Sequence, residues 1–154
     1  RRPMRHYLRL RAIAALAASS IACDEDLSSL TGPTPNLEPT FASIQANIFE
    51  ASDSSNRVPC VNCHTNVGRL PAANLNLLRD FAYDQLVSRA SLERPGTLRV
   101  DPGSPDTSYL VDKLSATPRT PIVGLRMPLN SPAYLTDGQI QVIRRWIETG
   151  ALRN

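Results

Sequence analysis

The chain has 154 residues, the usual size of one domain with a single hydrophobic core. Aromatic residues make up only 5% of it and 13 residues are proline, so we expect a fold rich in loops. The formal net charge is +3, but five arginines lie within the first 11 residues, and without them 17 − 5 = 12 basic residues stand against 14 acidic ones. This balance leaves no basic surface and argues against nucleic-acid binding.

Residues 1–22 have the pattern of an export signal. The arginines precede an apolar run over residues 12–22, which is rich in small side chains and ends at Cys23. A positive start followed by a short apolar segment is typical of a signal peptide. The run is shorter than the roughly 20 apolar residues that span a membrane. An amphipathic surface helix is the alternative, and it fits less well because the run is apolar on all its faces.

Two interpretations of Cys23 stay open. The sequence SIAC resembles a bacterial lipobox, in which the cysteine is lipidated and becomes the new N-terminus, although Ser20 stands where a leucine is usual. The other interpretation is simple cleavage of the signal. Residues 23–38 are polar and contain proline and glycine, so we expect a tether. The prediction is an exported lipoprotein, anchored at Cys23 in the periplasm or on the outer face of the cytoplasmic membrane, with its domain over residues 39–152.

The first helix is expected over residues 38–52. Its apolar residues, Phe41, Ile44, Ile48 and Phe49, recur at helical spacing, and Thr40 is a suitable N-cap.

The sequence VPCVNCHT at 58–65 then places Cys60, Cys63 and His64 in the spacing C-x-x-C-H. A structural zinc site needs four protein ligands, and the only other histidine is His6 in the export signal. A thioredoxin-like dithiol expects a βαβ unit, and the chain has no strand-like run to supply one. A covalently attached haem uses all three residues: the thiols add to the two vinyl groups of the porphyrin, and the histidine binds the iron. The motif therefore predicts one haem c.

Three more helical segments and one loop follow. Helices are expected over residues 79–89, from Ser104 as N-cap with Pro105 at the first helical position, and over the final segment TDGQIQVIRRWIETG. In this last helix Thr136 and Gln139 form a capping box, and Gly150 follows the end. The proline-rich residues 117–131 are expected to form an ordered loop.

That loop contains Met127, the only methionine besides Met4 in the export signal. Histidine with methionine on the opposite side is the ligation of electron-transfer cytochromes, so Met127 is the candidate second axial ligand. Core packing is the alternative role for this methionine, and Lys113 is a more distant alternative ligand.

On these residues, the chain from about residue 38 to 152 resembles the class I monohaem c-type cytochromes. The matching features are CVNCH, LPAANLNL (70–77), DPGSPDTSYLVDKL (101–114), GLRMP (124–128) and the closing helix. The resemblance implies an all-α cytochrome c fold, with N- and C-terminal helices crossing over one haem and Phe41, Ile44, Phe49, Ile143 and Trp146 at the crossing.

The resemblance also implies roles around the haem. His64 would donate its other ring N–H to a backbone carbonyl near Leu70–Pro71. The residues implied for the haem pocket are Leu70, Pro71, Leu75, Leu77 and Leu125. Polar groups that could reach the haem propionates are Arg69, Asn76, Arg126 and Tyr134, each of which could equally be a solvated surface residue.

The function predicted is that of a one-electron carrier outside the cytoplasm, which is not itself an enzyme and which meets redox partner proteins. One alternative is a fixed haem subunit of a larger membrane redox complex. A second alternative is a five-coordinate haem protein that senses a gas or reacts with peroxide, if Met127 is not a ligand.

Overall fold

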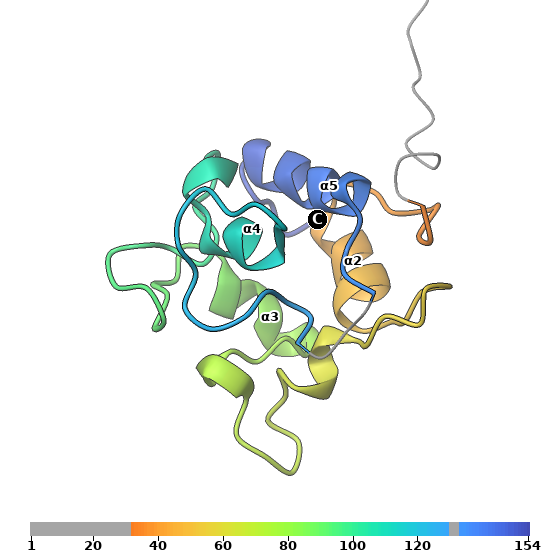
Figure 1. Ribbon diagram of the computed structural model, residues 1–154, viewed down its shortest axis with the longest axis horizontal. Helices are drawn as coiled ribbons and strands as arrows, with labels where there is room; N and C mark the ends of the chain where they lie inside the picture. The colour runs from red at the N-terminus through yellow and green to blue at the C-terminus, as the bar shows by residue number, and fades with distance from the viewer. Residues whose placement is uncertain (1–31, 130–132) are drawn as a thin grey trace, which may run out of the picture.

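The computed structural model describes residues 32–129 and 133–154, and the predictions for the export signal and for Cys23 lie outside these ranges. Short helices joined by long loops make up the described part (Figure 1). Strand-like pairing among the described residues is limited to two isolated bridges, Val87 with Val100 and Ala90 with Leu98. The helical elements are α2 (Phe41–Ile44), the π-helix η1 (Gln45–Phe49), α3 (Arg79–Leu86), α4 (Tyr109–Leu114), α5 (Asp137–Glu148) and the 3-10 turns η2 (Cys60–Asn62), η3 (Ala72–Asn74) and η4 (Pro105–Thr107).

Helices α2 and α5 pack against each other at the centre of the hydrophobic core (Figure 1). The ring of Phe41 lies 5.6 Å from that of Trp146 and meets the edge of Tyr83 at 5.1 Å, measured between ring centroids. Ile44 and Ile143 are completely buried beside them. An aromatic cluster of this kind adds directional ring contacts to the burial of apolar area. All five residues expected at the crossing therefore belong to one core, which includes Phe49.

Both N-caps predicted for these helices are confirmed. The Thr40 side chain accepts a hydrogen bond from the Ser43 backbone at the start of α2. At the start of α5, Thr136 and Gln139 form the reciprocal capping box. After α5 the chain turns at Gly150, whose φ of 101° is open to glycine and strained for other residues.

The segment before α2 packs onto α5. Thr34 and Leu37 are buried, and the Gln139 side-chain amide donates to the Thr34 hydroxyl at 2.6 Å. The same amide donates to the Asp53 carboxylate at 3.2 Å. The packed part of the chain thus includes residues before 39, the start expected from composition, because the Leu37 side chain joins the hydrophobic core.

A buried arginine closes the C-terminal end of η1. Arg57 is fully buried and donates to the carbonyls of Ile48, Asn47 and Ala51 at 2.9, 3.2 and 3.1 Å. Its Nε pairs with the Asp53 carboxylate at 3.2 Å. Carbonyls at a helix end have no partner within the helix, so this guanidinium supplies the donors that they lack. It also fixes the chain three residues before Cys60.

Three helices are shorter than the sequence indicates, and the first of them, expected over residues 38–52, spans only α2 and η1. Helix α3 ends at Leu86 because Val87 turns into extended backbone and forms the bridge to Val100. The helix expected from Ser104 is interrupted at Ser108, so Pro105–Thr107 form only a 3-10 turn and α4 begins at Tyr109. The physical reason is local, since the Ser108 hydroxyl accepts from the Asp101 backbone and holds residue 108 extended.

Candidate functional site

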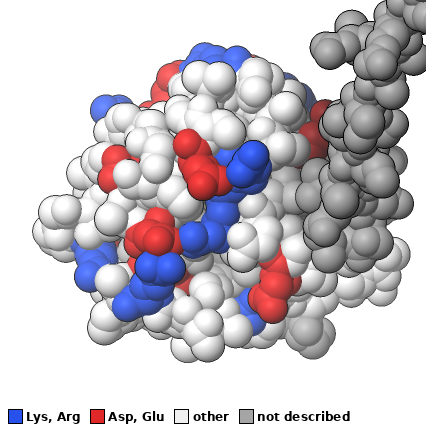
Figure 2. Space-filling model, turned by 90° about the horizontal axis from the view of Figure 1, so that it is seen from above, with Lys and Arg blue, Asp and Glu red and all other residues white. Residues whose placement is uncertain are grey.

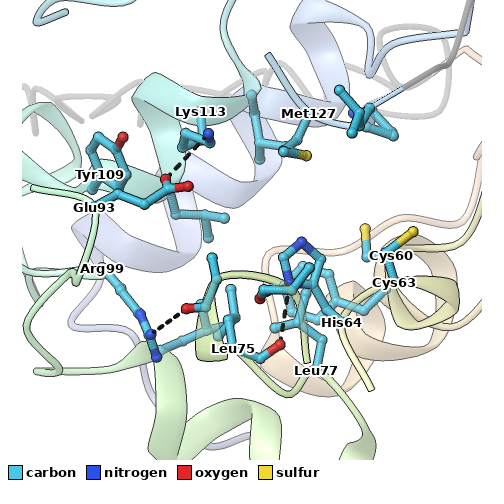
Figure 3. Close-up of a pocket in the computed structure, with 18 of the residues that line it drawn as sticks. Cys60, Cys63, His64, Leu75, Leu77, Glu93, Arg99, Tyr109, Lys113 and Met127 are labelled. Atoms are coloured by element: carbon cyan, nitrogen blue, oxygen red, sulfur yellow. Dashed lines mark hydrogen bonds and ion pairs between the residues drawn. The ribbon is translucent and has the colours of Figure 1, made fainter. Parts of the chain in front are cut away.

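The described residues surround a cavity of about 320 Å³ between the C-x-x-C-H segment, α4 and the loop that carries Met127 (Figure 3). Most of the side chains that line it are apolar, and they come from elements far apart in the sequence. They include Ile48 and Phe49 of η1, Leu75, Leu77, Leu86, and Leu110 and Leu114 of α4. An apolar cavity with a few polar groups is the usual form of a small-molecule or cofactor site.

Both cysteines of the motif lie at one end of this cavity (Figure 3). They begin and follow the 3-10 turn η2, and neither forms a disulfide. Cys60 is half-buried, with its sulfur 3.6 Å from the Ile48 carbonyl oxygen, whereas Cys63 is exposed. Burial raises the pKa of the Cys60 thiol to about 11, although the charge of Arg57 opposes the shift. In the protein alone, Cys60 is therefore a neutral thiol at pH 7.

The ring of His64 is held by the backbone that follows it. Its Nδ1 lies 3.0 Å from the Ala72 carbonyl oxygen and 3.2 Å from that of Leu75. Because both carbonyls only accept hydrogen bonds, Nδ1 carries the proton and Nε2 keeps its lone pair. Burial lowers the pKa of His64, which favours this neutral form. The ring is thus prepared to bind a metal through Nε2, with its orientation fixed by the carbonyls.

The backbone acceptor expected for His64 near Leu70–Pro71 is the carbonyl of Ala72, the next residue, and Leu75 supplies a second one. Both carbonyls reach the ring because the chain makes the turn η3 at this point, with φ of 52° at Ala73. The turn is tied back to the motif by a hydrogen bond from the Ala72 N–H to the Cys63 carbonyl at 3.1 Å.

Met127 lies across the cavity from His64, and Figure 3 shows its sulfur and the imidazole ring facing each other over the open space. Two hydrogen bonds fix this loop to the end of α4. The Met127 N–H donates to the Lys113 carbonyl at 2.8 Å, and the Arg126 Nε donates to the Leu114 carbonyl at 2.7 Å. The last carbonyls of α4 thereby gain donors, and the methionine gains a fixed position.

The other end of the cavity is polar (Figure 3). The Lys113 ammonium donates to the Val123 carbonyl at 2.9 Å and pairs with Glu93 at 3.2 Å. Tyr109 lies beside them, and burial raises the pKa of its hydroxyl. Arg99 donates to the carbonyls of Gln85, Ala73 and Asn74 at 2.9, 3.3 and 3.2 Å. Glu93 and Arg99 belong to no motif of the sequence, and they meet Tyr109 only in the folded chain, so sequence reasoning missed them.

Of the pocket residues implied by resemblance, Leu75 and Leu77 line the cavity, whereas Leu70, Pro71 and Leu125 do not. Leu70 and Leu125 are 90% and 66% exposed. Leu125 therefore lies at the surface of the same loop whose Met127 lines the cavity.

Among the four polar candidates for the propionates, only Arg69 lines the cavity. Arg126 instead donates to backbone carbonyls, and its guanidinium lies 4.3 Å from the centre of the exposed Tyr134 ring. The Asn76 side chain is buried and accepts from the Leu78 backbone.

No group of three or more His, Cys, Asp or Glu side chains within residues 32–129 and 133–154 converges as a set of metal donors. The same part of the chain has no helix both long and apolar enough to cross a membrane. Comparison of the chain with protein-family models, with curated proteins and with solved structures gave no match.

Proposed function

We propose that the chain is a one-electron carrier that holds one covalently attached haem c. The observation that carries the proposal is the state of His64: its Nδ1 proton is committed to two backbone carbonyls, and its ring faces Met127 across an apolar cavity that has both motif cysteines at one end. The cavity supports this function because it joins two thiols, an imidazole nitrogen and a thioether, which are the donors that c-type haem uses.

Each of these residues has a distinct task. The thiols of Cys60 and Cys63 would each add S–H across one vinyl group, forming two thioether bonds with no leaving group. Nε2 of His64 and the thioether sulfur of Met127 would hold the haem iron. When bound, the haem iron supplies the reversible exchange of one electron between its ferrous and ferric forms.

The cavity walls would tune this exchange. Apolar side chains such as Leu75, Leu77 and Leu114 exclude water, which limits solvent reorganisation around a change of charge. A thioether ligand favours the ferrous state and therefore a relatively high potential. Lys113, Tyr109 and Arg99 lie at the end away from the cysteines, where they would face the carboxylate-bearing side of the ring.

Partner recognition is proposed to depend little on charge. Figure 2 shows acidic and basic side chains interspersed over one face of the molecule, with no extended region of one sign. Such a distribution gives weak electrostatic steering, so charge would add little to the rate at which redox partner proteins associate with the chain. From the export signal and the lipid anchor predicted at Cys23, we propose that this exchange occurs in the periplasm or at the outer face of the cytoplasmic membrane.

A redox titration of the purified protein, followed by its visible spectrum, tests the function. We expect one reversible one-electron transition between low-spin forms, with little binding of carbon monoxide by the reduced protein. A high-spin reduced spectrum with ready carbon monoxide binding would instead support the five-coordinate sensor or peroxide-reactive protein. Stable co-purification with a large membrane complex would favour the fixed subunit over a tethered shuttle.

A further inference from the structure

A second hollow of about 300 Å³ adjoins the polar end of the cavity. It is lined by Asn74, Gln85, Arg89, Ala90, Leu92 and Arg99, of which Leu92 and Arg99 also line the main cavity. The lining contains two guanidinium groups and two side-chain amides, and no carboxylate. The four polar side chains thus bring two positive charges and two amides to one place, with no negative charge among them.

The bonding of these groups leaves most of the donors unused. Within the described residues, the structure gives the Arg89 guanidinium neither a hydrogen bond nor an ion pair, so its donors are free. The Gln85 Oε1 accepts from the Asn76 backbone at 2.7 Å, which leaves its Nε2 as the group that can donate into the hollow. Arg99 uses three donors on carbonyls and retains the rest.

The charges in the hollow are unbalanced. Burial lowers the pKa of Arg99, and the positive charge of Arg89 lowers it further. The carboxylate of Glu93 raises the pKa of Arg99, but this side chain lines the main cavity and is paired with Lys113. The two guanidinium groups repel each other, and an anion between them would relieve that repulsion while accepting their hydrogen bonds.

We propose that this hollow is a binding site for a small oxyanion of the phosphate or carboxylate class. Planar guanidinium forks match the paired oxygens of such anions, and the free amides of Asn74 and Gln85 add neutral donors. The site goes beyond electron transfer and does not depend on it, because it requires no bound cofactor. Its shared residue Arg99 would bring the anion's charge next to the main cavity.

Isothermal titration calorimetry of the purified full-length protein with inorganic phosphate, at constant ionic strength, tests the site. We expect saturable one-site binding that Arg89→Gln weakens by about tenfold or more, since it removes charge-assisted hydrogen bonds. Arg89 is exposed, and within the described residues its guanidinium has no partner to lose, so this variant should fold normally.

The matched control is Arg145→Gln, which removes one exposed guanidinium from a surface pair with Glu148 on α5. It lowers the net charge equally and should leave the phosphate affinity unchanged. Absence of saturable heat in the wild-type protein would overturn the proposal. A cofactor carboxylate that already fills the hollow would give the same result, and the hollow would then not be a separate anion site. Equal weakening by Arg89→Gln and Arg145→Gln would overturn it as well, because the effect would then be one of net charge.

Discussion

Replacement of Arg57 by methionine is expected to destabilise the fold strongly. The methionine keeps much of the side-chain length, but removes the donors to the carbonyls of Asn47, Ile48 and Ala51 and the partner of Asp53. Asp53 is itself 3% exposed at its side chain, so the change leaves a buried carboxylate without its cation. Removal of one partner from a buried pair typically costs about 3–5 kcal/mol. Against a total stability of about 5–15 kcal/mol for a domain, this is a large loss.

Urea unfolding followed by far-ultraviolet circular dichroism measures this loss in the haem-containing protein. The matched control is Arg145→Met, which breaks an exposed pair and should change the stability by less than about 1 kcal/mol. An Arg57→Met variant whose free energy of unfolding falls by no more than that of Arg145→Met would refute the reasoning. The guanidinium would then contribute little to closing η1 or to holding the chain before Cys60.

Three further predictions concern single positions. Burial raises the pKa of Asp53, but hydrogen bonds from Ser55 and Gln139 and the charge of Arg57 outweigh it and lower the pKa from 3.8 to about 2. The Asp53 carboxylate therefore contributes about 2 kcal/mol to the free energy of unfolding above pH 3.8, and this contribution is lost as the pH falls toward 2. Asp53→Asn should make the free energy of unfolding depend less steeply on pH in that window. An unchanged slope would contradict this. Met127→Leu should keep the covalent haem but lower the reduction potential and admit carbon monoxide to the reduced iron; an unshifted potential would remove Met127 as a ligand. Arg126→Met should loosen the Met127 loop and raise carbon monoxide binding, without loss of covalent haem, whereas binding as low as in the wild type would show that the hydrogen bond to Leu114 does not position the sulfur.

The sequence was sufficient for features that depend on neighbours along the chain. The capping box of Thr136 and Gln139 and the N-cap Thr40 were predictable because capping is decided within one helical turn. The apolar stripes of the first and last helices identified core residues for the same reason. Motif spacing alone singled out Cys60, Cys63 and His64, which the structure brings to one cavity.

Features that depend on the path of the loops were harder to predict. Leu70 and Leu125 were expected at the cavity by resemblance, but whether a loop residue faces inward depends on the turn that precedes it, which the leucine does not reveal. Arg126 was a candidate for the propionates, yet its nearest acceptor is the free carbonyl at the end of α4. Glu93 and Arg99 could not be found from spacing, since a polar group beside a cavity is defined only by tertiary contacts.

The central claim is that Cys60 and Cys63 bind a porphyrin covalently, and the mass of the denatured polypeptide tests it most directly. The protein should be produced in a host that attaches haem to exported C-x-x-C-H motifs, then unfolded and washed with acidic acetone before mass spectrometry. We expect the polypeptide to retain the mass of one haem, and Cys60→Ser with Cys63→Ser to yield little or no haem-bearing protein. A wild-type polypeptide that carries no porphyrin mass after this treatment would contradict the account.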